Sequence, residues 1–157
     1  MGSFLSRLLR ALGLGPRAPA AAPATTVSTD SPSQSSSDSS PGHSRVQAFH
    51  STPTWQLHFN TVKQTSKLML IDFTASWCGP CKRMQPVVDA MASKFTDVEF
   101  VKIDVDELSD VAQEFGVQAM PTFVLVKKGK EVDRLLGASK DELERKIQKH
   151  RALVPTS

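Results

Sequence analysis

The two cysteines of the chain lie in one short motif, Trp77-Cys78-Gly79-Pro80-Cys81. Disulfide exchange needs a thiolate, and the start of a helix lowers a thiol pKa because its unpaired N–H groups and dipole favour negative charge. A gap of two residues lets both sulfurs meet across a first helical turn, where Pro80 fits because it has no N–H to leave unpaired. The motif therefore predicts that Cys78 attacks a target disulfide and that Cys81 resolves the mixed disulfide.

Three other interpretations of the cysteine pair are weaker. A zinc site would need about two further ligands at knuckle spacing. The four histidines are instead scattered singly, at His43, His50, His58 and His150. A permanent disulfide across two residues would constrain almost nothing, and a chance pair of core cysteines is less expected again. We therefore expect no metal site and no bound cofactor, only a redox-active disulfide.

Asp72 is the second candidate group, because it interrupts the apolar run 68–74 six residues before Cys78. If that strand is covered on both faces, burial raises the pKa of the Asp72 carboxyl and makes it a proton acceptor for Cys81. The alternative is a solvated carboxylate at an exposed strand end. The apolar residues that precede Asp72 favour burial.

Two neighbouring features leave alternatives open. Trp77 either fills the core or forms an exposed platform beside Cys78, and its place at a strand end favours the platform. An X-Pro bond is cis in only about 5–6% of cases, so residue chemistry alone predicts a trans bond between Met120 and Pro121.

Hydrophobic periodicity predicts alternating strands and helices from residue 46 onward. Strands are expected at 46–49, 68–74, 98–105, 122–126 and 131–136, with a turn over 127–130. Helices are expected at 52–66, after Cys78, at 108–115 and after Ser139. Thr52 is the expected N-cap of the first, and Ser139 with Glu142 the capping box of the last. This order predicts an α/β fold with parallel first strands and a terminal hairpin.

Composition limits the classes of function. The 157-residue chain has a net charge of +3, and residues 46–157 are nearly neutral, with 15 basic and 14 acidic residues. Such a domain lacks a basic stripe, so we expect no nucleic-acid partner. No apolar run is long enough for a transmembrane helix, and the front of the chain lacks a secretory signal. Two cysteines in one motif favour a reducing compartment.

Residues 1–45 form an extension of different composition. Its part 15–45 is rich in Pro, Ala and Ser, which predicts disorder, whereas residues 1–13 can form a short amphipathic helix. The start Met1-Gly2-Ser3-Phe4-Leu5-Ser6 fits N-myristoylation of Gly2. A mitochondrial transit peptide is one alternative, because the segment carries Arg and Ser and no acidic residue. An inert tail is the other.

Residues 46–152 resemble the thioredoxin family. The resemblance rests on W-C-G-P-C, the full redox motif of that family, joined at matching separations by Asp72, Met120-Pro121, Gly129 and Gly137. It implies a thioredoxin domain over 46–157. In that fold a central mixed five-stranded sheet is flanked by four helices.

The resemblance also implies roles for particular residues. Pro121 would be cis and lie beside the cysteines, and Asp72 and Lys102 would form a buried acid–lysine pair behind Cys81. A target peptide would lie in a groove and pair with backbone groups beside Pro121 like an added strand. The motif and groove residues implied in this way are Trp77, Gly79, Pro80, Met120, Pro121 and Gly137.

Further details are similar to plant h-type thioredoxins. Segments 74–77 and 102–106 resemble that group, and segment 49–55 resembles its members with an N-terminal extension. The resemblance implies a protein-disulfide reductase that acts on disulfide-containing target proteins and is re-reduced by NADPH-dependent thioredoxin reductase. We expect a monomer in the cytoplasm, with peripheral membrane contact if Gly2 is acylated. The alternative location is mitochondrial.

Two competing functions make different predictions. A disulfide isomerase or oxidase would more often carry His between the cysteines and a secretion signal, so the Gly-Pro spacer disfavours it. A redox-independent binding module or holdase chaperone, tethered by the extension, would keep its main activity without Cys78 and Cys81.

Overall fold

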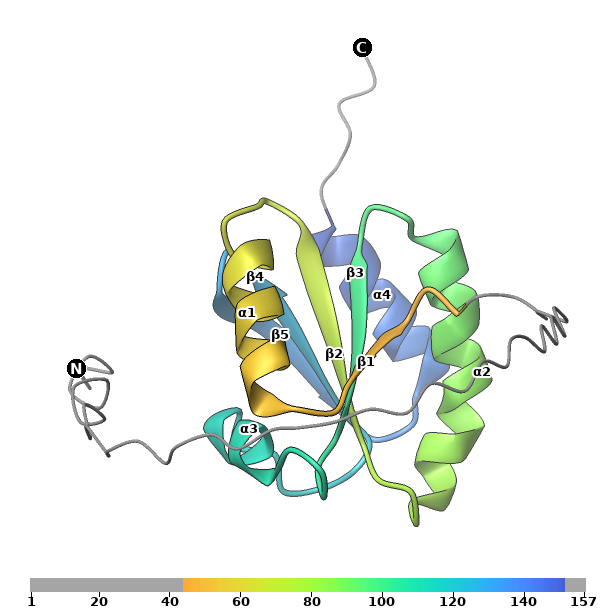
Figure 1. The fold of residues 1–157 in the computed structure, drawn as a ribbon. Coiled ribbons are helices and arrows are strands. Elements are labelled where there is room, and N and C mark those ends of the chain that lie inside the picture. The colour runs from red at the N-terminus through yellow and green to blue at the C-terminus, as the bar shows by residue number, and fades with distance from the viewer. Residues whose placement is uncertain (1–43, 152–157) are drawn as a thin grey trace, which may run out of the picture. The chain divides into compact units, whose positions relative to one another are not determined.

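The computed structural model describes residues 44–151, and the expectations for 1–43 and 152–157, acylation and disorder included, lie outside them. Strands and helices follow in the predicted order (Figure 1). The strands are β1 (Gln47–Phe49), β2 (Leu68–Thr74), β3 (Glu99–Asp104), β4 (Thr122–Lys127) and β5 (Lys130–Leu136). The helices are α1 (Thr52–Val62), α2 (Gly79–Lys94), α3 (Ser109–Glu114) and α4 (Lys140–His150). Within this described part, no helix is long and apolar enough to span a bilayer.

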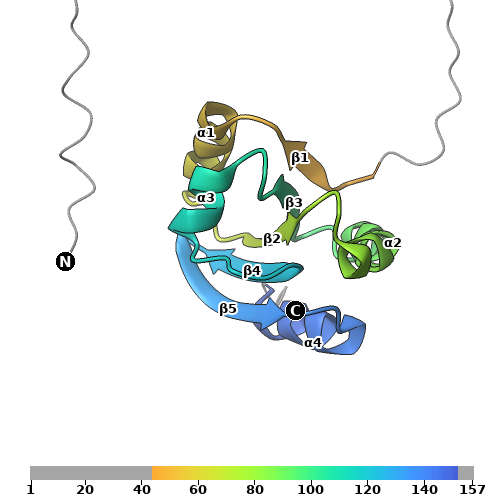
Figure 2. The same ribbon diagram turned by 90° about the horizontal axis from the view of Figure 1, so that it is seen from below.

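The strands form one mixed sheet in the order β1-β3-β2-β4-β5. β1 and β2 run parallel to β3, whereas β4 runs antiparallel to β2, and β5 antiparallel to β4. The sheet is the middle layer, with α1 and α3 on one face and α2 and α4 on the other (Figure 2). The predicted mixed sheet of five strands with four flanking helices is confirmed. Because β1, β3 and β2 are parallel, their carboxyl ends meet at one edge of the sheet.

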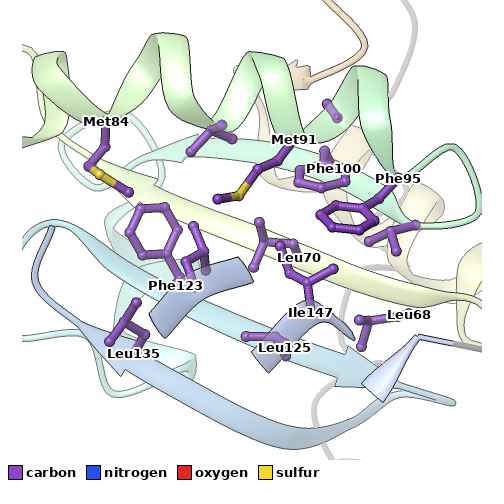
Figure 3. Packing of buried hydrophobic residues seen from close by; sticks show 14 residues of the cluster. Leu68, Leu70, Met84, Met91, Phe95, Phe100, Phe123, Leu125, Leu135 and Ile147 are labelled. Atoms are coloured by element: carbon purple, nitrogen blue, oxygen red, sulfur yellow. The ribbon is translucent and has the colours of Figure 1, made fainter. Parts of the chain in front are cut away.

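Alternation along the central strand β2 decides what each face of the sheet buries. Leu68 and Leu70 belong to the apolar cluster beneath α2 and α4 (Figure 3), whereas Met69 and Ile71 belong to the cluster beneath α1 and α3. Successive side chains of a strand point to opposite faces. Asp72 therefore lies on the α2 face, and a strand buried on both sides explains the nearly continuous apolar run.

The predicted N-cap residue of α1 and the predicted capping box of α4 are wrong, although Ser139 does cap α4 in position. The N-cap of α1 is Ser51 rather than Thr52, because the Thr52 hydroxyl donates to the Asp110 carboxylate at 2.8 and 2.9 Å. Ser139 is the N-cap of α4, but its side chain makes no capping hydrogen bond. Glu142 instead lies 3.9 Å from a lysine of the next helical turn, so the predicted capping box does not form.

The turn between β4 and β5 is tighter than predicted. The strands extend to Lys127 and from Lys130, which leaves Lys128 at φ +52° and Gly129 at φ +77° as a two-residue turn. Positive φ at both positions is typical of the I′ turn, whose twist matches that of the flanking strands. A Cβ at position 129 would lie 3.2 Å from Cβ of Lys63, so the glycine also lets the hairpin approach the end of α1.

α4 is held against the sheet by apolar and charged contacts. Leu143 and Ile147 are completely buried in the cluster shown in Figure 3. Asp133 of β5 accepts a hydrogen bond from Lys146 at 2.7 Å and lies 2.9 Å from Nε2 of His150. The Lys146 hydrogen bond holds the pKa of the Asp133 carboxyl well below its usual range. The apolar pair therefore supplies burial, and Asp133 fixes the position of the helix along the sheet.

We predict that Ile147→Ala lowers the free energy of unfolding by about 2–5 kcal/mol, because it opens a cavity in a fully buried cluster. Urea unfolding followed by circular dichroism measures this change. Gln148→Ala, at the next and exposed position, is the matched control and should stay within about 0.5 kcal/mol of the unsubstituted protein. Equal effects of the two substitutions would contradict docking of α4 through Ile147.

Candidate active site

α2 begins just after β2, at the edge where the parallel strands end (Figure 1). The cysteine pair lies at this helix start. Cys78 is the N-cap of α2, and its Sγ accepts a hydrogen bond from the Cys81 backbone N–H at 3.2 Å. The two sulfurs are bonded to each other, and the two Cα atoms are 5.3 Å apart. An otherwise unpaired N–H of the helix start is thus directed at the leading sulfur. The same N–H stabilises a Cys78 thiolate once the disulfide is reduced.

The cysteines are mostly covered, whereas the residue before them is exposed. The exposed fraction is 3% for Cys78, 6% for Cys81 and 67% for Trp77. The Trp77 indole N–H donates to the Asp106 carboxylate at 3.0 Å, which holds the ring against the loop that follows β3. The predicted exposure of Trp77 is confirmed. The partner Asp106 was not predicted, because a contact between residues 29 apart has no local sequence signal.

The loop before β4 lies beside the dithiol. The Met120-Pro121 bond is cis, as the resemblance implied and against the expectation from residue chemistry alone. Met120 packs against the small buried cluster that Ala75 forms with the two cysteines. The Gly137 N–H donates to the Pro121 carbonyl at 2.9 Å, which ties the end of β5 to this loop. The structure therefore brings Met120, Pro121 and Gly137 together at the redox end of the sheet.

Asp72 is a buried carboxyl behind the cysteines. It is 6% exposed, and its Oδ1 has no hydrogen-bond partner in the described part of the chain. Burial raises the pKa of its carboxyl from 3.8 to about 7; Lys102 opposes this shift, and Asp89 adds to it. Lys102 lies directly opposite Asp72 in the register of β2 and β3. No contact within 4.0 Å joins the two charged groups among the described residues, so Lys102 acts on Asp72 without a direct ion pair.

A cavity of about 340 Å³ has both Asp72 and Cys81 in its wall. Lys102 lines it from the sheet, and His50 and Glu107 line it from the ends of β1 and β3. His50 Nδ1 and Glu107 Oε2 are 2.7 Å apart, a contact between residues 57 apart that the sequence did not predict. The cavity has room for several water molecules. It therefore provides space for water between the buried carboxyl and the second cysteine.

The described residues offer little to a metal ion. No three His, Cys, Asp or Glu side chains of residues 44–151 are grouped as ligands. His43 lies outside this range, and each of the other histidines faces one carboxylate: His50 with Glu107, His58 with Glu99, and His150 with Asp133.

Comparison with known proteins agrees with this geometry. A family model described as Thioredoxin matches residues 50–149. Thioredoxin H2 of Arabidopsis thaliana is 63% identical over 109 residues, which are 69% of this chain and 82% of that protein. The crystal structure of thioredoxin NaTrxh from Nicotiana alata is 70% identical, with a TM-score of 0.70, and the match covers 73% of this chain and 99% of that one. Poplar thioredoxin h PtTrxh4 is 35% identical, with a TM-score of 0.64, over 67% of this chain and 95% of that one.

Sequence, fold and site geometry thus agree on the kind of protein. The family match spans the strand, helix and loop that surround the bonded sulfurs of Cys78 and Cys81. The protein is a thiol–disulfide oxidoreductase with these two cysteines as its redox pair. The chain belongs to the thioredoxin family and is of the plant h type.

Proposed function

We propose that this thioredoxin reduces disulfides in other proteins and is itself re-reduced by an NADPH-dependent thioredoxin reductase. The hydrogen bond from the Cys81 N–H to the Cys78 sulfur carries this proposal, because it selects the sulfur that is stabilised as a thiolate. The Cys78 thiolate attacks one sulfur of the target disulfide, and the other target sulfur leaves as a thiolate. Cys81 then attacks Cys78 and releases the second target thiol. The two electrons passed to the target are restored by the reductase.

Asp72 is the proton acceptor for Cys81 in this proposal. The Cys81 thiol must lose its proton before it attacks, and Asp72 lies in the wall of the same cavity. A carboxyl with a pKa of about 7 exchanges protons readily near neutral pH. Water in the cavity would carry the proton between the two groups, with Lys102 moderating the charge that appears on the carboxylate.

The surface around the dithiol supports binding of an extended target segment. Trp77 is exposed, Gly79 and Pro80 are exposed on the first turn of α2, and Met120 and Gly137 are half-buried. Backbone groups beside Pro121 lie at the start of β4, where an added strand can pair with them. A target disulfide held there would reach the small exposed part of Cys78.

We predict that Cys78→Ser lowers insulin reduction, assayed with NADPH and thioredoxin reductase, to the uncatalysed rate, because a hydroxyl does not replace the thiolate. Cys81→Ser should still attack targets, and mixed disulfides should accumulate on non-reducing gels. Ser93→Ala, exposed on the last turns of α2, is the control with full activity. Insulin reduction that persists in both cysteine variants would overturn the proposal. A holdase would be expected to keep its main activity in these variants.

Asp72→Asn is expected to stabilise the oxidised protein, in which neither cysteine titrates. The Asp72 carboxyl has a pKa of about 7 in the folded chain against 3.8 ordinarily, so the folded state binds the extra proton between these values. The free energy of unfolding therefore falls as the pH rises from about 4 to about 7, and Asn removes this loss. The gain should reach up to about 4 kcal/mol above that range and largely vanish below it.

Urea unfolding at several pH values measures this effect. Glu114→Gln makes the same carboxyl-to-amide change at an exposed position and is the matched control, with no comparable pH dependence expected. A gain from Asp72→Asn that stays constant with pH would show that the carboxyl is not titrating in the folded protein.

We further propose that the protein is cytoplasmic and is attached to membranes by a myristoyl group on Gly2. The support is the sequence pattern alone, Met1-Gly2 followed by Ser6. The intact mass of protein purified from its native cells should include one myristoyl adduct, which Gly2→Ala removes. Loss of the first tens of residues would instead indicate a mitochondrial transit peptide.

A further inference from the structure

The end of the domain away from the dithiol carries four exposed lysines, called here the lysine face: Lys63, Lys67, Lys128 and Lys130. They lie at the end of α1, just before β2, and at the β4–β5 turn. The pairing of Lys127 with Leu68 places this turn beside the start of β2. The dithiol follows the other end of β2. β2 runs from one of these ends to the other (Figure 1). Its seven residues separate the two ends by roughly 20 Å.

The lysine face is compact and without carboxylate partners. Lys63, Lys67 and Lys128 line one shallow depression over Gly129. Within residues 44–151, no carboxylate oxygen lies within 4.0 Å of the four ammonium groups. The nearby acidic residues are engaged elsewhere, namely Glu131 with Arg134, Glu99 with His58, and Asp97 with Arg151.

Local structure does not account for lysine at position 128. Its φ of +52° is a left-handed conformation in which Asn or Gly is less strained. Lys128 is exposed and has no carboxylate partner among the described residues. The physical property that it adds at this position is its positive charge.

The redox end has a different balance of charge. Residues 104–110 hold four carboxylates, and the first turns of α2 hold Lys82 and Arg83. Four carboxylates against two cations leave this end net negative. The lysine face gathers four cations, and the nearby Glu99 and Glu131 already have partners of their own. An external negative surface therefore attracts one end of the domain and not the other.

We propose that the lysine face binds the anionic surface of a phospholipid membrane and holds the dithiol outward. Exposed ammonium groups gathered at one end of the domain suit a layer of anionic headgroups. Single-stranded nucleic acid is bound by grooves with stacking aromatic rings, and the lysine face has no exposed aromatic residue. One acyl chain alone anchors only marginally, and a basic patch is the kind of second signal that makes such binding stable.

The test uses the full chain made in bacteria without N-myristoyltransferase, so that it does not depend on acylation of Gly2. Sedimentation with vesicles measures binding to phosphatidylcholine alone and to phosphatidylcholine with phosphatidylserine. Lys67→Gln/Lys128→Gln should weaken binding to the anionic vesicles by about fivefold for each lysine, the equivalent of about 1 kcal/mol per charge. Lys140→Gln/Arg145→Gln removes the same charge from exposed positions of α4 and should change binding little.

A second measurement tests the orientation. Alkylation of Cys78 in the reduced protein, followed by mass spectrometry, should proceed at the same rate on anionic vesicles and in solution. Slower alkylation on vesicles would place the dithiol against the lipid and overturn the proposal. Equal losses in the two double variants would overturn it too, as would vesicle binding that is independent of Lys67 and Lys128 while binding of single-stranded RNA depends on them.

Discussion

The reactivity of the site depends on one contact, the hydrogen bond from the Cys81 N–H to the Cys78 sulfur. It forms because α2 starts where β2 ends, and β2 is held at the centre of the sheet by β3 on one side and β4 on the other. Neighbours on both sides fix the point at which the chain leaves the sheet. The cis bond at Pro121 and the end of β5 complete the surroundings from the same edge. A helix N-terminus over a strand end thus gives one of two chemically identical thiols a stabilised anion.

The buried carboxyl behind this contact lowers the free energy of unfolding, and its surroundings decide by how much. Asp72 has an unpaired oxygen in a strand that is otherwise apolar, and burial raises the pKa of its carboxyl. A direct ion pair with Lys102 would stabilise the carboxylate and lower that pKa, which would make Asp72 a poorer proton acceptor near neutral pH. Lys102 opposes the shift from the neighbouring strand without such a pair. The cavity supplies the remaining solvation, so Asp72 stays buried without being fixed in one protonation state.

Local patterns in the sequence predicted the elements well and the long-range contacts poorly. The apolar run of β2 and the periodicity of α2 are properties of consecutive residues, so both could be recognised, together with the cysteine motif and the burial of Asp72. The prediction of the caps was wrong for a physical reason. A hydroxyl can hydrogen-bond to its own helix or to a group that the fold brings near, and the Thr52 hydroxyl donates to Asp110, 58 residues away. For the same reason the sequence did not predict the contacts of Trp77 with Asp106 and of His50 with Glu107. The cis bond at Pro121 followed only from resemblance, because the chemistry of the dipeptide favours trans.

The length of β2 also separates the chemistry from the charges at the far end of the domain. Charges in water interact over a Debye length of about 8 Å at physiological ionic strength, whereas the strand places the lysine face roughly 20 Å from the dithiol. Exposed lysines there are too far away to act on the Cys78 sulfur or on the cavity at Asp72. The four lysines also join no ion pair within the described residues, and all four are exposed. The residues of the lysine face can therefore be replaced without altering the redox chemistry at the opposite end of the sheet.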